Sequence, residues 1–329
     1  MIRFGVIGAG RIGKVHAATI AANPKAKLAY IADALPKAAE ELAAKHGAKV
    51  ASINEIMASK DVDAVLIGSP TGFHAEQIQA ASNAGKAIMC EKPVSLDVKT
   101  ILETLKVVEK NKSTLMIGFN RRFDPSFAEV ESRVRKGDVG NVEMVTVISR
   151  DPGPPPAEYV KGSGGIFRDM MIHDFDLARF LMGEEFVVVS ALGAVLVDKA
   201  IGEAGDVDTA AVQMQTKSGK IAVITNSRRA TYGYDQRLEV HGSKGMIHAK
   251  NVHNTTVEIL NETGYRADPI QNFFISRYSV AYANELNTFI AAVESGKRDP
   301  RPSGFDGLQA QILAEAATES WKTGKPVKV

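Results

Sequence analysis

One stretch near the N-terminus of this 329-residue chain predicts the fold of its first domain: Arg3-Phe4-Gly5-Val6-Ile7-Gly8-Ala9-Gly10-Arg11-Ile12-Gly13. An apolar run leads into a G-x-G-x-x-G pattern at Gly8, Gly10 and Gly13, and an Ala-rich helical segment follows. Glycines at this spacing permit a tight turn, let a pyrophosphate approach the backbone, and let the helix pack closely on the strand. The stretch therefore predicts a dinucleotide-binding strand–turn–helix.

The same rhythm continues outward from this turn. Short apolar runs alternate with helical patterns as far as about residue 119, which is typical of βαβ units around a parallel sheet. The strand-like runs are residues 3–8, 27–33, 64–68, 87–91 and 115–119, and the helical segments are 15–22, 36–46, 54–58, 74–84 and 98–111. Residues 1–119 are therefore predicted to form an α/β Rossmann domain with a doubly wound parallel sheet.

Beyond residue 120 the pattern changes. Long β-type runs dominate this part of the chain, with a helical pattern before them and another near the end. The β-type runs are residues 186–198, 207–216, 220–228, 236–241 and 255–260, and the helical patterns are 165–182 and 307–323. We predict a second domain over residues 120–329, an α+β domain whose large open sheet is mostly antiparallel and carries its helices on one face.

Composition excludes several classes of partner. Forty basic and 38 acidic side chains leave a net charge of +2, which predicts neither nucleic acid nor an anionic membrane as a partner. No apolar run is long enough to span a bilayer, and the N-terminus has no signal-peptide layout. The single cysteine, Cys90, cannot form an intrachain disulfide, so we expect a cytoplasmic protein.

Asp33 indicates which dinucleotide binds. It lies 20 residues after Gly13, at the end of the second strand-like run, where a carboxylate accepts a hydrogen bond from a ribose 2′-hydroxyl. The same carboxylate repels a 2′-phosphate, and neither Ala34 nor Leu35 supplies a guanidinium to hold one. The expected cofactor is NAD, with its phosphates at the loop that contains Arg11 and Ile12 and at the start of the following helix.

Two further segments end strands at the same rim of the predicted sheet. Ser69-Pro70-Thr71-Gly72-Phe73-His74 follows one strand, and Glu91-Lys92-Pro93 ends the next. The first is either part of the cofactor site or an ordinary βα turn. Pro93 keeps Lys92 out of the helical region, so its side chain can project from the strand end. An ammonium beside a reacting oxygen stabilises developing negative charge, and the alternative is a surface lysine before a turn.

A second candidate centre lies in Gly164-Gly165-Ile166-Phe167-Arg168-Asp169-Met170-Met171-Ile172-His173. On one predicted helix Asp169 and His173 are four residues apart and share a face, so the carboxylate can orient the imidazole as a proton acceptor. The alternatives are a surface pair or a metal site completed by Asp176. No HExxH motif or cysteine cluster accompanies these residues, so no metal is expected.

These motifs together resemble one family. GAGRIG at residues 8–13, Asp33, EKP at 91–93, GFNRRFD at 118–124, GGIFRDMMIHDFD at 164–176 and TYGYDQRLEVHG at 231–242 are similar, in this order, to the glucose-fructose oxidoreductase/inositol dehydrogenase superfamily, and most of all to its bacterial inositol dehydrogenases. The resemblance covers essentially the whole chain. It implies a Rossmann domain followed by an α/β domain with a large open sheet, usually in a homotetramer.

The resemblance also implies roles for individual residues. Lys92 would act on the reacting hydroxyl, His173 would be the acid/base, and Asp169 its partner. The expected cofactor-binding residues are Gly8, Gly10, Arg11, Ile12, Gly13, Asp33, Ser69, Pro70, His74, Glu91 and Lys92. The expected substrate-binding residues are Lys92, Asn120, Arg121, Asp151, Tyr159, Asp169, His173 and Tyr234.

The expected reaction is NAD-dependent oxidation of one secondary hydroxyl of a small cyclic polyol, with myo-inositol giving 2-keto-myo-inositol. The hydrogen-bonding candidates suit a polyhydroxylated ring better than an apolar alcohol. Scyllo-inositol, chiro-inositol or an aldopyranose such as glucose are alternative substrates. Two other functions remain open at this point: an NAD-dependent glycosidase that oxidises and re-reduces its substrate within one turnover, and a non-catalytic NAD-binding protein.

Overall fold

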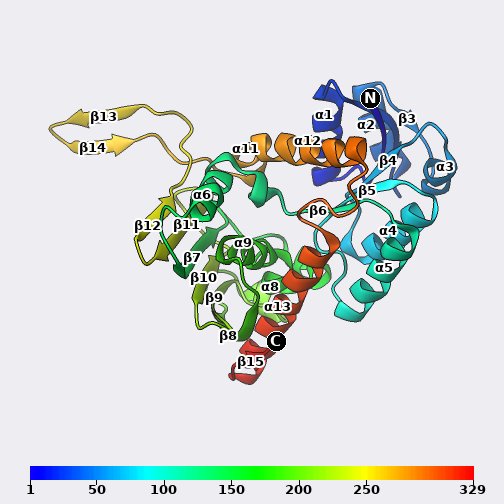
Figure 1. Cartoon of the computed structure of the whole chain (residues 1–329). Helices are drawn as coiled ribbons and strands as arrows, with labels where there is room; N and C mark the ends of the chain where they lie inside the picture. The colour runs from blue at the N-terminus through cyan, green and yellow to red at the C-terminus, as the bar shows by residue number, and fades with distance from the viewer. The chain divides into compact units, whose positions relative to one another are not determined.

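The computed structural model describes residues 1–329. The chain divides into two compact units (Figure 1). The first comprises Met1–Phe123 and Ala281–Gln311, and the second comprises Asp124–Val280 and Ile312–Val329. The first crossing of the chain is close to the domain boundary predicted between residues 119 and 120. The return of residues 281–311 to the first unit was not part of that prediction.

The first unit contains a six-stranded sheet in the order β3-β2-β1-β4-β5-β6. Its strands are β1 Ile2–Ile7, β2 Ala26–Ala32, β3 Lys49–Val50, β4 Ala64–Ile67, β5 Ala87–Glu91 and β6 Leu115–Gly118. Every neighbouring pair is parallel. The strand order reverses between β1 and β4, and ligands of doubly wound sheets bind at such a switch point. The predicted Rossmann sheet is confirmed.

Helices follow these strands, and local capping residues mark where several of them begin or end. They are α1 Arg11–Ala22, α2 Pro36–His46, α3 Ile53–Ala58, η1 Thr71–Phe73, α4 His74–Asn83, α5 Val98–Asn111 and η2 Asn120–Phe123. A capping box between Ser52 and Glu55 starts α3, and the Asp97 side chain caps α5. Gly47, in the left-handed conformation with φ of 68°, ends α2 after a basic last turn.

The core of the first unit includes residues from the far end of the sequence. Helix α12 (Ser279–Ser295) contributes Leu286, Phe289 and Ile290 to the same apolar cluster as Phe4 and Leu28. The Phe289 ring lies 6.0 Å from that of Phe4. Burying large apolar side chains stabilises by about 1.5–3 kcal/mol each, so this unit depends on α12 for its stability.

The second unit is built on a seven-stranded sheet in the order β12-β11-β7-β10-β9-β8-β15. The strands are β7 Val142–Arg150, β8 Phe186–Ala194, β9 Thr209–Thr216, β10 Ile221–Ser227, β11 Asp235–Gly242, β12 Gly245–Ala249 and β15 Val327–Lys328. All neighbours are antiparallel except β7 and β10, which are parallel. The predicted mostly antiparallel sheet is confirmed.

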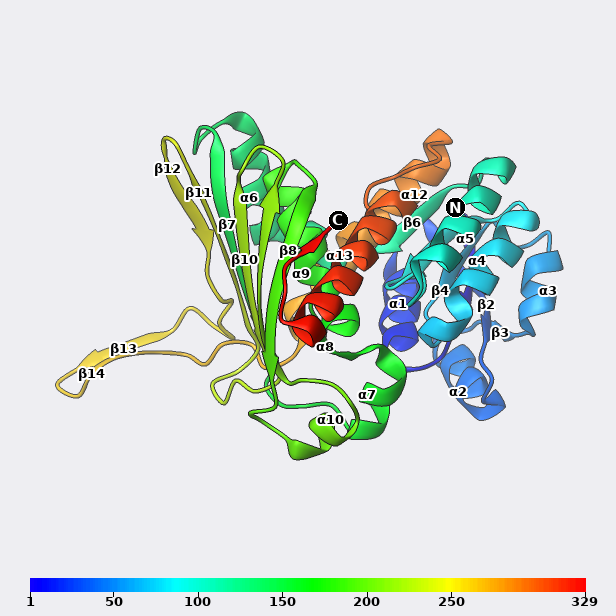
Figure 2. The ribbon, with the colours of Figure 1, turned by 90° about the horizontal axis from the view of Figure 1, so that it is seen from below.

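The helices of this unit are α6 Pro125–Lys136, α7 Ala157–Ser163, α8 Gly165–Asp169, α9 Ile172–Met182, α10 Lys199–Glu203, α11 Phe274–Arg277 and the end of α13 Gly304–Thr323. Helices α6, α8, α9 and the end of α13 lie on one face of the sheet and leave the other open, whereas α7 and α10 lie at one end of the strands (Figure 2). Residues alternate between buried and exposed along β9, as a sheet with one covered face requires. No helix of the chain combines the length and the apolar character needed to cross a membrane.

Three predicted elements differ from the structure. The helix predicted over residues 165–182 is two helices, α8 and α9, separated at Met170 and Met171. The strand predicted over 186–198 ends at Ala194, because Asp198 caps the short helix α10. The run 255–260 does not join the large sheet. Its end forms β13 Glu258–Asn261, which pairs only with β14 Gly264–Ala267 in a separate projecting hairpin.

Candidate active site

The three glycines of the first loop have different reasons to be glycine. Gly8 has φ of 106°, and a Cβ atom there would lie 2.5 Å from the Gly68 carbonyl oxygen. A Cβ atom on Gly13 would lie 1.9 Å from the Gly8 carbonyl oxygen. Around Gly10, by contrast, no atom lies within 4 Å of a built Cβ. Gly8 and Gly13 therefore permit close packing, and Gly10 leaves open space above the loop for a pyrophosphate.

Helix α1 begins directly after Gly10, which serves as its N-cap. A glycine cap has no side-chain oxygen, so the first amide groups of the helix face the loop without a competing internal acceptor. These amides and the positive end of the helix dipole suit an anion. The residues present thus fit the diphosphate of NAD.

Asp33 directly follows β2 and holds this loop. Its Oδ2 accepts a hydrogen bond from the Ala9 amide at 2.6 Å, and its Oδ1 accepts one from the Leu35 amide at 2.8 Å. A carboxylate has about four acceptor sites, so two remain for the hydroxyls of a ribose. Asp33 therefore has a structural role in addition to the predicted contact with the ribose, because it fixes the backbone of the glycine loop.

His74 bridges the two loops at the sheet's carboxyl edge. Its Nδ1 lies 2.7 Å from the Pro93 carbonyl oxygen and its Nε2 lies 2.8 Å from the Ser69 carbonyl oxygen. Burial lowers the pKa of this imidazole, although both carbonyls favour its protonated form. Both nitrogens are engaged with the backbone, so His74 positions the loops rather than reaching a cofactor itself.

Lys92 lies where β5 ends and is partly buried. The peptide bond between Lys92 and Pro93 is cis. Glu91 directly precedes it, and the Glu91 Oε1 lies 2.7 Å from Nε2 of the buried His16. Because His16 belongs to α1, this contact ties the strand end that bears Lys92 to the helix of the cofactor loop. Sequence patterns did not indicate His16.

Glu285, on α12, is fully buried near Glu91, and neither of its carboxyl oxygens has a hydrogen-bond partner. Burial, followed by the charge of Glu91, raises the pKa of this carboxyl well above its usual value. The folded protein therefore binds a proton here that the unfolded chain releases. The resulting stability is complete below the unfolded pKa and is lost as pH rises toward the folded one.

Replacing Glu285 with glutamine is expected to flatten the dependence of thermal stability on pH. A neutral amide of the same shape removes the ionisation, which contributes a slope of at most about 1.4 kcal/mol per pH unit. Melting temperatures from pH 5 to 9 would measure this, with the half-exposed Glu294 on the same helix changed to glutamine as the control. Equal slopes in the parent and in Glu285→Gln would show that Glu285 does not hold the proton.

In the second unit, Asp169 ends α8 and His173 is the second residue of α9. The Met171 amide bonds to the Ile166 carbonyl at 2.8 Å, which closes α8 with a wide turn. The prediction that Asp169 and His173 share one face of a continuous helix is wrong, because they lie on two separate helices. The pairing of Asp169 with His173 stays a prediction. Asp169 Oδ1 accepts a hydrogen bond from the Tyr159 hydroxyl at 3.0 Å.

Asn120 and Arg121 lie in η2, just after β6, and each is only 4% exposed. The Asn120 Oδ1 atom is buried with no hydrogen-bond partner. A buried amide oxygen without a donor is costly, so this position suits a ligand hydroxyl or amide. Among the predicted substrate contacts, Asn120 has the most direct structural support.

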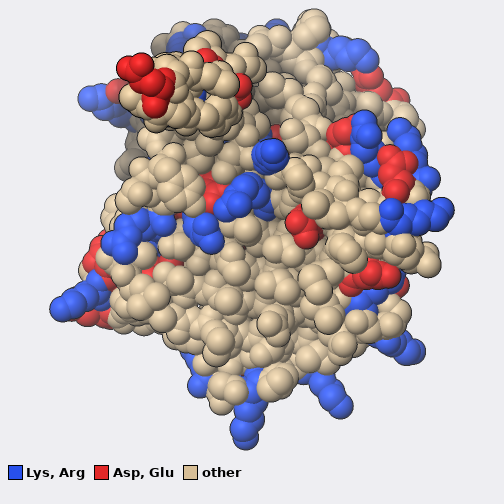
Figure 3. Space-filling view, turned by 90° about the vertical axis from the view of Figure 1, so that its left-hand side faces the viewer, with Lys and Arg blue, Asp and Glu red and all other residues tan.

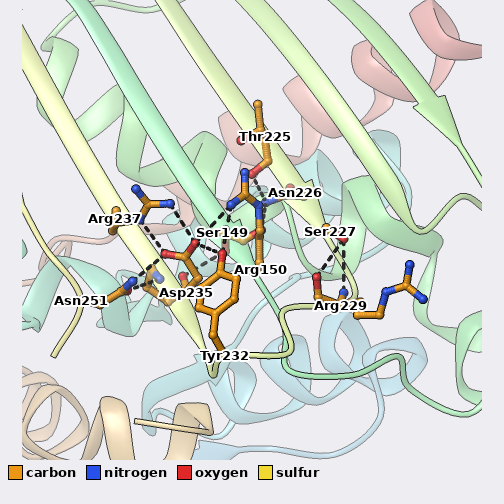
Figure 4. Close-up of polar contacts among 11 residues, drawn as sticks. Ser149, Arg150, Thr225, Asn226, Ser227, Arg229, Tyr232, Asp235, Arg237 and Asn251 are labelled. Carbon is orange, nitrogen blue, oxygen red and sulfur yellow. Dashed lines mark hydrogen bonds and ion pairs between the residues drawn. The ribbon is translucent and has the colours of Figure 1, made fainter. Parts of the chain in front are cut away.

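Asp151 and Tyr234 lie next to strand ends of the second unit. Asp151 follows β7, where its amide bonds to the Ser227 carbonyl, and the buried Tyr234 precedes β11 with its ring edge-on to Tyr278. Neighbouring Asp235 is fully buried and organises this rim (Figure 4).

The Asp235 carboxylate accepts hydrogen bonds from Arg237 at 2.7 and 2.9 Å, from the Tyr232 hydroxyl at 2.6 Å and from Asn251 at 2.7 Å, and Arg150 lies at 3.3 Å. These partners outweigh burial and lower its pKa to about 2. The network locks β7 and β11 in register beside Asp151 and Tyr234. Sequence patterns did not indicate it.

No group of three or more His, Cys, Asp or Glu side chains gathers in a way that could hold a metal ion. The metal site considered around Asp169, His173 and Asp176 is not assembled in the structure. Asp176 instead lies 3.8 Å from the Arg179 guanidinium on its own helix.

Both units of the chain are similar to known proteins. Residues 2–119 match the GFO/IDH/MocA oxidoreductase family model described as an NAD-binding Rossmann fold, and residues 131–329 match its C-terminal alpha/beta domain. An inositol 2-dehydrogenase of Rhizobium meliloti (strain 1021) is 56% identical over 97% of this chain and 96% of its own length. A myo-inositol 2-dehydrogenase of Thermotoga maritima is 46% identical over 100% of this chain and 98% of its own.

Solved structures of inositol dehydrogenases are also similar to this chain in fold. A crystal structure of scyllo-inositol dehydrogenase from Lactobacillus casei, with bound NAD(H) and scyllo-inositol, superposes with a TM-score of 0.93 at 32% identity. The superposition covers 100% of this chain and 99% of that one. The similarity therefore extends over both units.

Proposed function

Because the chain belongs to the GFO/IDH/MocA oxidoreductase family, we propose that it oxidises one secondary hydroxyl of a cyclic polyol with NAD, converting myo-inositol to 2-keto-myo-inositol. The observation that carries this proposal is the similarity over nearly the full length to two enzymes named as inositol 2-dehydrogenases. The open space above Gly10 and the placement of Asp33 at the end of β2 support NAD as its cofactor.

We propose that three side chains carry the chemistry. NAD, when bound, accepts the hydride. His173 takes the proton of the substrate hydroxyl. Asp169 orients the imidazole and favours the protonated form that results, and Lys92 stabilises the oxygen as it becomes negative. The rest of the protein positions the ring and excludes competing reactions.

The binding sets follow from the family motifs together with the geometry within each unit. The proposed cofactor-binding residues are Gly8, Gly10, Arg11, Ile12, Gly13, Asp33, Ser69, Pro70, Glu91 and Lys92, with His74 holding their loops. The proposed substrate-binding residues are Lys92, Asn120, Arg121, Asp151, Tyr159, Asp169, His173 and Tyr234. A cytoplasmic location is also proposed, in keeping with the single free thiol at the buried Cys90.

The test of this function is NADH formation across a panel of myo-, scyllo- and chiro-inositol and glucose. The highest kcat/KM is expected for an inositol, with one NADH formed per ketone. An enzyme that cleaves a glycoside without net NADH formation would show the transient-oxidation chemistry instead. A chain that binds NAD and reduces none of it with any polyol would overturn the proposal.

Cofactor preference gives a sharper prediction. Replacing Asp33 with Ser and Leu35 with Arg together removes the carboxylate and adds a partner for a 2′-phosphate. Losing a hydrogen bond to a charged group costs about 1.5–3 kcal/mol, so kcat/KM with NAD should fall by roughly 10- to 100-fold while that with NADP rises. Leu35→Arg alone, which keeps the carboxylate, is the matched control. Comparable kcat/KM values for both cofactors in the parent enzyme would contradict the role of Asp33.

We also propose that the chain assembles as a homotetramer through the open face of its large sheet. The outward positions of β9 and β10 carry no charge, and Figure 3 shows a broad area without charged side chains below a band of lysines and arginines. These outward residues are Thr209, Ala211, Gln213, Gln215, Ile221, Val223, Thr225 and Ser227. An uncharged, partly apolar sheet face suits a two-fold contact.

The projecting hairpin supports a second contact between copies. Val257, Ile259, Leu260 and Tyr265 are 51–74% exposed there, and an isolated two-stranded hairpin has little stability of its own.

A charge placed on the open sheet face should break the assembly. Val223, at the centre of β10 opposite Gln213, becomes a buried carboxylate in any sheet-to-sheet dimer when it is changed to Glu. Light scattering should give a tetramer mass for the parent and a smaller mass for Val223→Glu. Leu102→Glu, at a 44% exposed position on α5, is the control. A parent of monomer mass at micromolar concentration would rule out the assembly, and an unchanged mass for Val223→Glu would rule out this surface.

A further inference from the structure

The surroundings of Asp169 contain a buried arginine that the mechanism has not used. Arg228 directly follows β10 and is 2% exposed. Its Nη2 lies 3.7 Å from Asp169 Oδ2 and 3.9 Å from Asp206 Oδ2. A guanidinium keeps its charge even when buried, so it needs anions close by. Here it has two, from separate parts of the second unit.

Asp206 lies at the other end of the short helix α8. Its two oxygens accept the Ile166 amide at 3.1 and 2.9 Å. A Cβ atom on Gly165, whose φ is 81°, would lie 2.6 Å from Asp206 Oδ1, so only glycine allows this approach. Asp206 therefore holds the start of α8, while Arg228 faces the carboxylate at its end.

Arg228 lies between two acids, Asp169 and Asp206, so acidic side chains outnumber the cation here. Burial raises the pKa of Asp206, with a further rise from Asp169, whereas the amides of Ile166 and Val207 and the charge of Arg228 lower it. Two carboxylates thus share one cation. Arg168, although adjacent to Asp169, donates to the Thr318 hydroxyl at 3.2 Å. Asp169 also accepts a hydrogen bond from the Tyr159 hydroxyl, and Arg228 supplies a cation close to both acids.

Building on the proposed function, we propose that Arg228 is a positioning residue for the reaction: it holds the Asp169 carboxylate in place at the end of α8 so that Asp169 can orient His173. Nε and Nη2 of Arg228 are buried and have no hydrogen-bond partner, so the guanidinium acts on Asp169 as a nearby charge and not through a fixed pair of hydrogen bonds. Removing it takes away the cation that lies between the two acids, so the carboxylates repel each other and Asp169 is no longer held at the end of α8.

The experiment compares Arg228→Met, Arg228→Lys and Asp169→Asn, singly and combined, in the full chain. Arg228→Met is expected to lower kcat on the best inositol by on the order of 10- to 100-fold, with little change in the Kd for NAD. Its rate should also rise with pH at a more alkaline value than the parent's. Arg228→Lys should keep part of the rate, because it restores the charge without the planar fork.

Combining Arg228→Met with Asp169→Asn shows whether Arg228 acts through Asp169 or only stabilises the fold. In an Asp169→Asn background, Arg228→Met should cost little more, because the carboxylate it serves is already neutral. Asp206→Asn should restore part of the rate lost in Arg228→Met by removing the competing acid. If the losses from Arg228→Met and Asp169→Asn multiply, or if Asp206→Asn restores nothing, Arg228 has only a structural role.

Arg229 provides the matched control. It is the next residue, is exposed, and donates to the Leu196 carbonyl at 3.4 Å. Figure 4 shows its backbone bonded to Ser227. Arg229→Met should keep the parental rate and pH profile, and an equal loss there would overturn the assignment to Arg228. Should Arg228→Met not fold, Arg228→Lys in the two Asp169 backgrounds gives the same coupling. Failure of the proposed function would be visible separately, as a parent without inositol oxidation or an Asp169→Asn variant with parental kcat.

Discussion

Replacing His173 with alanine is expected to lower kcat for the best inositol by about 10²- to 10⁴-fold, the usual cost of losing a general base. The imidazole is proposed to act mainly in the transition state, when the hydroxyl proton leaves, so the Kd for NAD should change little. Stopped-flow measurement of NADH formation, together with NAD titration by fluorescence, would separate the two effects.

The pH profile gives a second measure of the same role. Because the base must begin deprotonated, the parental rate should rise with pH across roughly pH 5 to 8, and the rise should disappear in His173→Ala. His241, a 55% exposed residue on β11, is the control histidine, and His241→Ala should keep the parental profile. A His173→Ala variant with near-parental kcat would show that the residue is structural and that another group takes the proton.

Lys92→Met is expected to lower kcat by about 10²- to 10³-fold, as the loss of one donor to a developing oxyanion does. The methionine side chain has a similar length and no charge, so the fold of the strand end should persist. Lys99→Met, at an exposed position on the neighbouring helix α5, should leave the rate unchanged. Equal losses in the two variants would mean that charge in this region, and not Lys92, affects the reaction.

A variant that combines Lys92→Met and His173→Ala tests whether Lys92 and His173 act on the same substrate hydroxyl. Groups that act on the same atom are strongly non-additive, so Lys92→Met with His173→Ala should lose much less than the product of the single losses. Multiplying losses would mean that the two side chains act in separate steps, which would contradict the proposed mechanism.

Local signals explain why the first sheet could be predicted from the sequence. Its buried parallel strands are continuous apolar runs, and glycine, proline or capping residues mark the helix ends, as at Gly47 and Asp97. The glycine loop and Asp33 are close in sequence and in space, so their association was also predictable. The contact between the Asp33 carboxylate and the Ala9 amide was not, because no residue pattern encodes it.

The elements that were missed depend on distant partners or lack a local marker. Strand β7 begins Val142-Glu143-Met144, and two adjacent exposed residues interrupt its alternation. The break between α8 and α9 falls at Met170 and Met171, which are good helix formers. Arg228 and Asp206 come from loops far along the chain from Asp169, so only the folded second unit shows that the three belong together.

The divided first unit has a consequence for how the protein is made. When Phe123 has been synthesised, every strand of the Rossmann sheet exists, but Leu286, Phe289 and Ile290 do not. At roughly 5–20 residues per second, the ribosome needs on the order of ten to forty seconds more to reach Gln311. Throughout that time the surface of the nascent sheet that will receive α12 lies bare and apolar, so newly made chains should depend on chaperones most strongly in this interval. A message truncated anywhere between Asp124 and Val280 would yield a Rossmann sheet that cannot finish its core.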